Sequence, residues 1–410
     1  MPNSRLFVHG SHKSAGYGRW LDALEIHLGW QQMRDGRRTQ DFGSMAVRNE
    51  ANRSDLLGLT VQGSAIESDS HALTYGIDIY HDEVSSSRIE TDLATGNSSV
   101  VRARFPDGST LTNVDAYVHD RIGISRNLLL DVGLRLSHAR VDLAMTASSA
   151  AAQISNLDLS GSAGILYALS DTTDLVANLA RGFRAPNIFD LGTLGARPGN
   201  RFNIANPDLG PEAVITGDLG LRITHSRGTV EAVIWGSDYQ DKIVSVFTGM
   251  VDPGGRDIVQ SRNASSLSLQ GVELSGKWQM GERHLFDMTM NYTHGETSIA
   301  NQGTEPADRV PPLNGRFGWH YERSDWRAGA QWTFADQQNR LCARDIRDPR
   351  INPAGTPGWG VLNLLWSYNP GSQWRVSARM NNVFDRSYRY HGSGIDAAGR
   401  HLRLDVEGNF

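Results

Sequence analysis

Several features of common protein classes are missing from this sequence. A single cysteine, Cys342, among 410 residues excludes an internal disulfide framework. No apolar run approaches the roughly 18 residues of a membrane helix, so a helical membrane protein is excluded as well. The net charge of −5, without a basic stripe, argues against nucleic acid as a partner. The first residues lack the apolar core of a signal peptide, and none is expected there.

Short motifs of hydrolytic enzymes are also missing. The sequence contains neither Gly-x-Ser-x-Gly nor His-Glu-x-x-His, the local patterns that mark a nucleophilic serine or a zinc site. Dispersed residues could still converge in space, but the sequence singles out no such set. We therefore predict that the protein is not an enzyme, and we expect no cofactor and no bound metal.

The sequence does contain the residue alternation that is typical of β-strands. At the C-terminus, apolar and polar side chains fall on opposite faces: Leu402, Leu404, Val406, Gly408 and Phe410 against His401, Arg403, Asp405, Glu407 and Asn409. A period of two marks a strand, and a strand of about ten residues can cross a bilayer at a tilt. The second face is too charged for a sandwich core and suits a water-filled lumen. With Phe410 at its end, the segment resembles the closing strand of bacterial outer-membrane proteins. An amphipathic edge strand of a soluble sheet is the alternative.

The same alternation recurs along the chain and predicts about sixteen strands. The clearest spans residues 128–136, where leucine and valine alternate with residues that include Asp131 and Arg135. Short, turn-like links follow every second strand. Long polar links, such as residues 33–54, 81–111 and 249–266, lie between them. Because this sorting is typical of outer-membrane proteins, we predict an all-β fold, an antiparallel transmembrane β-barrel.

Several short motifs connect this pattern to a known family. Residues 181–186 (Arg-Gly-Phe-Arg-Ala-Pro) end a predicted strand, and proline suits the point at which a chain leaves the sheet. Residues 206–212 (Asn-Pro-Asp-Leu-Gly-Pro-Glu) lead back into the sheet with Asn-Pro turn chemistry. Together with residues 115–120, 271–274 and 381–388, these motifs resemble, in the same order, those of TonB-dependent outer-membrane receptors.

The resemblance implies a transport function. Members of the family bind ferric siderophores, haem or cobalamin at extracellular loops and import them with energy from TonB, through a barrel of about 22 strands that encloses a plug. We expect residues 1–20 to be a partial strand or a disordered start, and residues 21–410 to be the C-terminal part of such a barrel. No plug-like region is recognised in the sequence.

The resemblance therefore predicts a receptor in the outer membrane of a Gram-negative bacterium that imports an iron chelate, a ferric siderophore in preference to haem or cobalamin. The implied partners are outer-membrane lipid, the extracellular chelate and the TonB complex, the last only through a plug absent from this chain. Two alternatives stay open: a passive, porin-like channel and a non-functional truncated receptor fragment.

The candidate site residues form two sets. We call residues 181–186 the first box and residues 206–212 the second box. Residues of the two boxes either shape the rim of the barrel or contact the substrate directly: Phe183, Arg184, Ala185, Pro186, Asn206, Pro207, Asp208, Leu209 and Glu212. Haem receptors of the family carry a histidine between these boxes. Residues 187–205 contain none, so haem is less favoured as the substrate.

The second set lies in the last two predicted outer loops and includes possible contacts to an anionic chelate: Arg344, Arg347, Tyr388, Tyr390 and His391. Salt bridges with neighbouring aspartates are the alternative role for the arginines. For His391, an ordinary polar loop residue is the alternative to an axial haem ligand.

Overall fold

The computed structural model describes residues 3–68, 70–144, 151–192, 195–197, 201–300, 303–371 and 373–408. Phe410, the terminal aromatic of the predicted closing strand, lies outside these residues. The chain divides into two compact units. Unit 1 comprises Met1–Ala163, Ala180–Ile215 and Tyr239–Ser265, and unit 2 comprises Gly164–Leu179, Thr216–Asp238 and Ser266–Phe410.

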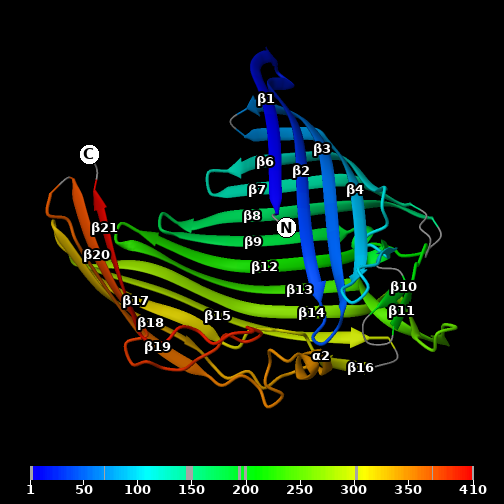
Figure 1. Cartoon of the computed structure of the whole chain (residues 1–410). Coiled ribbons are helices and arrows are strands. Elements are labelled where there is room, and N and C mark those ends of the chain that lie inside the picture. The colour runs from blue at the N-terminus through cyan, green and yellow to red at the C-terminus, as the bar shows by residue number, and fades with distance from the viewer. Residues whose placement is uncertain are drawn as a thin grey trace. The chain divides into compact units, whose positions relative to one another are not determined.

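Almost all regular structure is β-strand (Figure 1). The strands are β1 (Ser4–Gly18), β2 (Leu21–Gln40), β3 (Ala46–Ser68), β4 (His71–Asp92), β5 (Ser98–Val101), β6 (Ser109–Ser125), β7 (Leu128–Leu143), β8 (Ala152–Ser170), β9 (Thr173–Arg184), β10 (Gly195–Arg197), β11 (Arg201–Ile204), β12 (Glu212–His225), β13 (Gly228–Val251), β14 (Asp257–Met280), β15 (His284–Ile299), β16 (Gly303–Pro306), β17 (Asn314–Glu322), β18 (Trp326–Ala335), β19 (Trp359–Tyr368), β20 (Trp374–Asn381) and β21 (His401–Gly408). The helices are α1 (Ile188–Gly192) and α2 (Ala343–Arg347). Among the described residues, no helix is long and apolar enough to cross a membrane.

Within each unit, strands that follow one another in sequence pair antiparallel. In unit 1 this holds from β1 to β4 and on through β6 and β7. In unit 2 it holds from β15 through β17 to β21. Short β11 is an exception, since it pairs parallel to β14. The prediction of an all-β antiparallel fold is confirmed, and each predicted strand coincides with one long strand. Strand β1 occupies the region for which a partial strand or a disordered start was expected.

Several segments predicted as long polar loops are instead continuous strand. Strands β13 and β14 each run for 24 residues, so only residues 252–256 remain of the link predicted over residues 249–266. Likewise β2 and β3 leave only residues 41–45 between them. Beyond a bilayer both faces of a hairpin meet water, so pairing can continue after the apolar alternation has ended. Alternation therefore marks the membrane-length part of these strands and misses their extensions.

The two faces of the sheet have the polarity of a membrane protein. In unit 1, apolar side chains of β4 and β7, such as Ile77 and Leu134, are about half exposed. Asp78 and Asp115 lie on the other face and are each only 8% exposed. Arg135 Nη2 donates to both carboxylates, at 2.7 Å and 2.8 Å. This arrangement, with an exposed apolar face and paired charges on the opposite face, is the inverse of a soluble sandwich and is typical of transmembrane barrels.

Glycine lets aromatic rings cross the polar face of unit 1. Gly58 stands directly opposite Tyr80 in the β3–β4 register, and Gly76 stands opposite Tyr117 in the β4–β6 register. A Cβ at Gly58 would lie 2.7 Å from the Tyr80 ring, and one at Gly76 would lie 2.6 Å from the Tyr117 hydroxyl. Each tyrosine ring covers the backbone of the glycine opposite it, which has no side chain of its own. Such glycine–aromatic pairs help to fix the register of the strands.

Candidate functional site

The first box is joined to the second by one arginine. Arg184, at the end of β9, donates from Nε to Glu212 Oε2 at 2.9 Å and from Nη1 to Asp190 Oδ2 at 2.7 Å. Glu212 opens β12 and Asp190 lies in α1. Both carboxylate side chains are only 14% exposed, so one guanidinium is shared by two shielded negative charges. The sequence separates these residues, and Arg184 brings three elements together.

The second box is attached to β14 by amide side chains. Asn263 accepts from the Gly210 N–H at 2.8 Å and donates to the Gly210 carbonyl at 3.0 Å, in the manner of a paired strand residue. Asn206 Nδ2 donates to the Ser261 carbonyl at 2.9 Å. These bonds satisfy the backbone where the chain re-enters the sheet. Sequence reasoning missed the role of Asn263, because a polar residue on a long strand gives no pairing signal.

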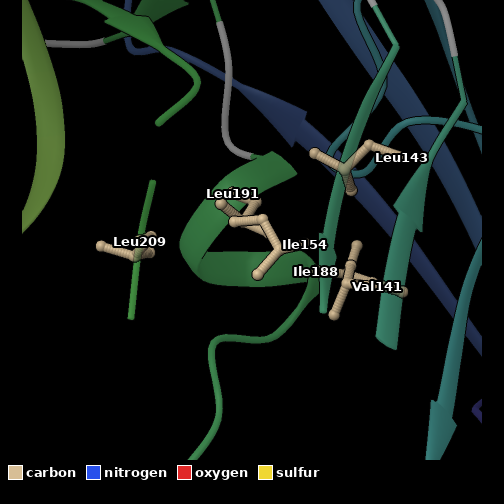
Figure 2. Packing of buried hydrophobic residues seen from close by; sticks show 6 residues of the cluster. All are labelled: Val141, Leu143, Ile154, Ile188, Leu191 and Leu209. Carbon is tan, nitrogen blue, oxygen red and sulfur yellow. The ribbon is translucent and has the colours of Figure 1, made fainter. Parts of the chain in front are cut away.

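A small hydrophobic cluster lies beneath the boxes. Its buried members are Val141, Leu143, Ile154, Ile188, Leu191 and Leu209. Figure 2 shows Ile188 and Leu191 on α1, between Leu209 on one side and Val141 and Leu143 of β7 on the other. Pro186 is also fully buried. The leucine of the second box and the proline of the first are therefore packing residues.

The remaining box residues are divided between a cavity and the surface. Phe183 and Ala185 line a cavity of about 420 Å³ in unit 1, together with Arg135, Asn113 and Ser137 of the polar face. Pro207 and Asp208 are exposed. Arg184 and Glu212 thus pair between the two boxes, Pro186 and Leu209 are buried, and Pro207 and Asp208 within the second box are open to solvent.

The second candidate set lies on two connections of unit 2, between β18 and β19 and between β20 and β21. The rings of Tyr388 and Tyr390 pack against the buried Trp359, with centroids 4.4 Å and 4.9 Å from it. His391 Nδ1 lies 2.9 Å from Thr356 Oγ1. Burial lowers the pKa of His391 from its ordinary value, although the Asp345 carboxylate acts in the opposite direction. A neutral imidazole is therefore favoured at physiological pH.

Arginine–aspartate pairs join the connection between β18 and β19 to the one between β16 and β17. Arg309 Nη2 donates to Asp348 Oδ2 at 2.6 Å, and Arg350 Nη2 donates to the same oxygen at 2.7 Å. The hydrogen bonds from Arg350 hold the pKa of Asp348 well below its usual range, and Arg309 adds to the effect. Arg344 Nη1 donates to Asp308 Oδ2 at 2.7 Å. Sequence reasoning missed Asp308 and Arg309, which belong to a different loop.

The two arginines of this set differ in their engagement. Both are exposed, but their partners differ. Arg344 pairs with Asp308 and keeps 68% of its side chain exposed, whereas Arg347 donates to the carbonyl of Ala343 within α2. Nearby Cys342 is buried and caps α2 by accepting from the Asp345 N–H at 3.4 Å. Burial raises the pKa of the Cys342 thiol, so the thiolate needed for reactivity is disfavoured.

A sheet with an exposed apolar face, a polar face rich in ion pairs and long connections that carry the candidate residues defines a barrel protein of the outer-membrane type. The chain belongs to the TonB-dependent receptor family: the model described as TonB dependent receptor-like, beta-barrel, matches residues 3–383. This is a family of outer-membrane receptors and transporters, and the resemblance inferred from the motifs is confirmed.

Solved structures of such receptors share the fold. The copper transporter OprC is similar with a TM-score of 0.83 and 20% identity, over 99% of this chain and 65% of that chain. The unliganded ferric citrate transporter FecA gives 0.78 and 16%, over 99% and 61%. The ferric yersiniabactin uptake receptor FyuA from Yersinia pestis gives 0.70 and 15%, over 99% and 61%. The chain thus spans less than two thirds of these proteins. No curated protein sequence matches it significantly.

Proposed function

We propose that the chain forms the barrel part of an outer-membrane receptor that binds and imports an iron chelate, a ferric siderophore in preference to haem or cobalamin. Membership of the family supports import as the activity. Two of the similar structures are a ferric citrate transporter and a ferric yersiniabactin receptor, which supports a chelate as the cargo. The outer membrane of a Gram-negative bacterium is the location that follows from this role.

The observation that carries the proposal is the group of outer connections in unit 2. The chain presents the guanidinium groups of Arg344 and Arg347 to solvent there, and the same connections hold Tyr390, which is 54% exposed. Oxygen-rich ferric chelates are commonly anionic, and guanidinium groups bind such oxygens through charge-assisted hydrogen bonds. The aromatic cluster around Trp359 fixes the backbone on which Tyr390 is presented.

For the two boxes we propose a role in shaping the rim, and not direct contact with the substrate. Arg184 is engaged by two carboxylates, and Pro186 and Leu209 are buried. Energy coupling to TonB would run through a plug encoded outside these residues, since the family model that matches describes the barrel. Lipid would contact the exposed apolar face.

Chelate binding is tested by tryptophan fluorescence of the chain refolded in detergent, titrated with ferric citrate, a ferric catecholate siderophore, haemin and cyanocobalamin. We expect saturable quenching by a ferric chelate. Arg344→Ala should raise its dissociation constant about tenfold, because one charge-assisted hydrogen bond is lost.

The matched control is Arg375→Ala. Arg375 is also an exposed arginine in an ion pair, with Glu407 at 3.4 Å, but it lies at the short-turn end of β20. This variant should bind as the wild type does. The proposal is contradicted if no chelate saturates, and conduction as an open pore in that case would support the passive channel.

A further inference from the structure

Two histidines face one another across the first hairpin of unit 1. His9 lies on β1 and His27 on β2, and the register pairs His9 with Gly29 and Ser11 with His27, so the two side chains are diagonal neighbours on one face. His9 Nε2 and His27 Nδ1 are 3.4 Å apart, and the ring centroids are separated by 5.5 Å. The same face carries Arg5 and Gln31, which bond at 2.7 Å, so this is the polar face of the hairpin.

A carboxylate stands behind one of these rings. Glu25 Oε2 lies 3.3 Å from His27 Nε2, and Lys13 Nζ donates to Glu25 Oε1 at 2.8 Å. An acceptor beside Nε2 favours the tautomer that carries its proton there, which leaves the Nδ1 lone pair free on the side of His9. Carboxylates hold metal-binding histidines in this way and raise the basicity of the ligating nitrogen.

The spacing of the two nitrogens fits a shared ion better than a hydrogen bond. N–H donors in proteins usually lie about 2.7–3.2 Å from their acceptors. Two imidazole nitrogens bound tetrahedrally to one ion, each at about 2.0–2.1 Å, lie roughly 3.3 Å from each other. The observed 3.4 Å is close to this value. His9 is exposed and His27 keeps about a third of its side chain accessible, so an ion can reach both.

We propose that His9 and His27 form a binding site for a borderline divalent transition metal ion, with Glu25 as the positioning residue behind His27. Among the described residues no group of three or more His, Cys, Asp or Glu side chains is arranged to hold a metal, so water or a donor from a solute would complete the coordination. Imidazole suits Zn²⁺, Cu²⁺ and Ni²⁺. The spacing matches a tetrahedral Zn²⁺ site, whereas Cu²⁺, which prefers a tetragonal arrangement, draws the two rings slightly closer and should bind most tightly of the three. The inference stands independently of the iron chelate proposed above, because it concerns a different part of the chain.

The test is Cu²⁺ binding to the full chain, without a polyhistidine tag, refolded in detergent at neutral pH and followed by calorimetry and electron paramagnetic resonance. We expect one ion per chain with nitrogen hyperfine structure from imidazole. His9→Ala and His27→Ala should each weaken binding at least tenfold. Glu25→Gln should weaken it about tenfold while keeping the nitrogen ligands, since it removes only the partner of a ligand.

The control is His12→Ala, on the same strand. His12 is paired opposite Ile26 on the other face of the hairpin, and its loss should leave binding unchanged. His9→Gln and His27→Gln repeat the test with larger side chains if an alanine variant fails to refold. The inference is overturned if the wild type binds no Cu²⁺, or if neither His9 nor His27 affects the binding that is seen. Equal losses in His12→Ala and His27→Ala would overturn it as well.

Discussion

Replacing Leu404 by arginine is expected to destabilise the chain in lipid by about 2–4 kcal/mol, whereas replacing Arg403 by leucine should have a small effect. Leu404 is 67% exposed, and its strand neighbours Leu402 and Val406 are exposed to a similar degree. In water such a row would be unfavourable, and in a bilayer it meets acyl chains. A charge placed near the middle of this strand must leave water for hydrocarbon, which accounts for the expected cost.

Arg403 is the matched control because it is the next residue on the same strand. Its Nε donates to Asp405 Oδ1 at 2.9 Å, and both side chains are well exposed, so the pair contributes at most about 1 kcal/mol. The measurement is the free energy of unfolding from urea titrations of the chain refolded into lipid vesicles. Equal losses in Leu404→Arg and Arg403→Leu would mean that the two faces have been assigned incorrectly.

Asn382→Ala is the second change with a large expected effect. Asn382 is 2% exposed and has a φ of 49°, a left-handed conformation that alanine adopts at a cost of about 1–2 kcal/mol. Its side chain accepts from the Arg386 N–H at 2.8 Å and donates to the Arg386 carbonyl at 2.8 Å. Without the amide, these buried backbone groups lose their partner, which costs about 1–3 kcal/mol. A total loss of roughly 2–5 kcal/mol is expected.

Asn382→Gly separates the two contributions. Glycine tolerates the positive φ but cannot replace the hydrogen bonds, so this variant should be less destabilised than Asn382→Ala. Urea titration gives the free energies, and hydrogen exchange should show that the loss of protection is concentrated between β20 and β21. A wild-type stability for Asn382→Ala would show that this turn does not depend on its asparagine.

The sequence predicted the fold well where one physical rule governs a whole strand. Lipid on one face and water on the other force apolar and polar residues to alternate, so β7 and β21 could be read residue by residue. This alternation is required only for the part of a strand that crosses the bilayer. Where β13 and β14 continue through residues 249–251 and 257–266, their alternation disappears although they remain strand, and we expect water on both faces there. For this reason the strands were predicted too short.

The candidate site was harder to predict, because its contacts join residues that are far apart in the sequence and follow no periodic pattern. Arg184 and Glu212 could be named from their motifs, but Asp190, which shares the same guanidinium, lies in a five-residue helix with no sequence signal. The bond from Arg309 to Asp348 joins two different loops. Such pairs depend on how loops are placed by the strands beneath them, which is a tertiary property.

We expect these strands to form a membrane-inserted antiparallel sheet whose apolar face contacts lipid. Heat-modifiable gel mobility of the wild-type chain, refolded into detergent micelles or lipid, tests it most directly. We predict a compact species that resists dodecyl sulfate when unheated and shifts in mobility on boiling, as paired transmembrane strands unfold together. A chain with the same mobility before and after boiling would contradict it.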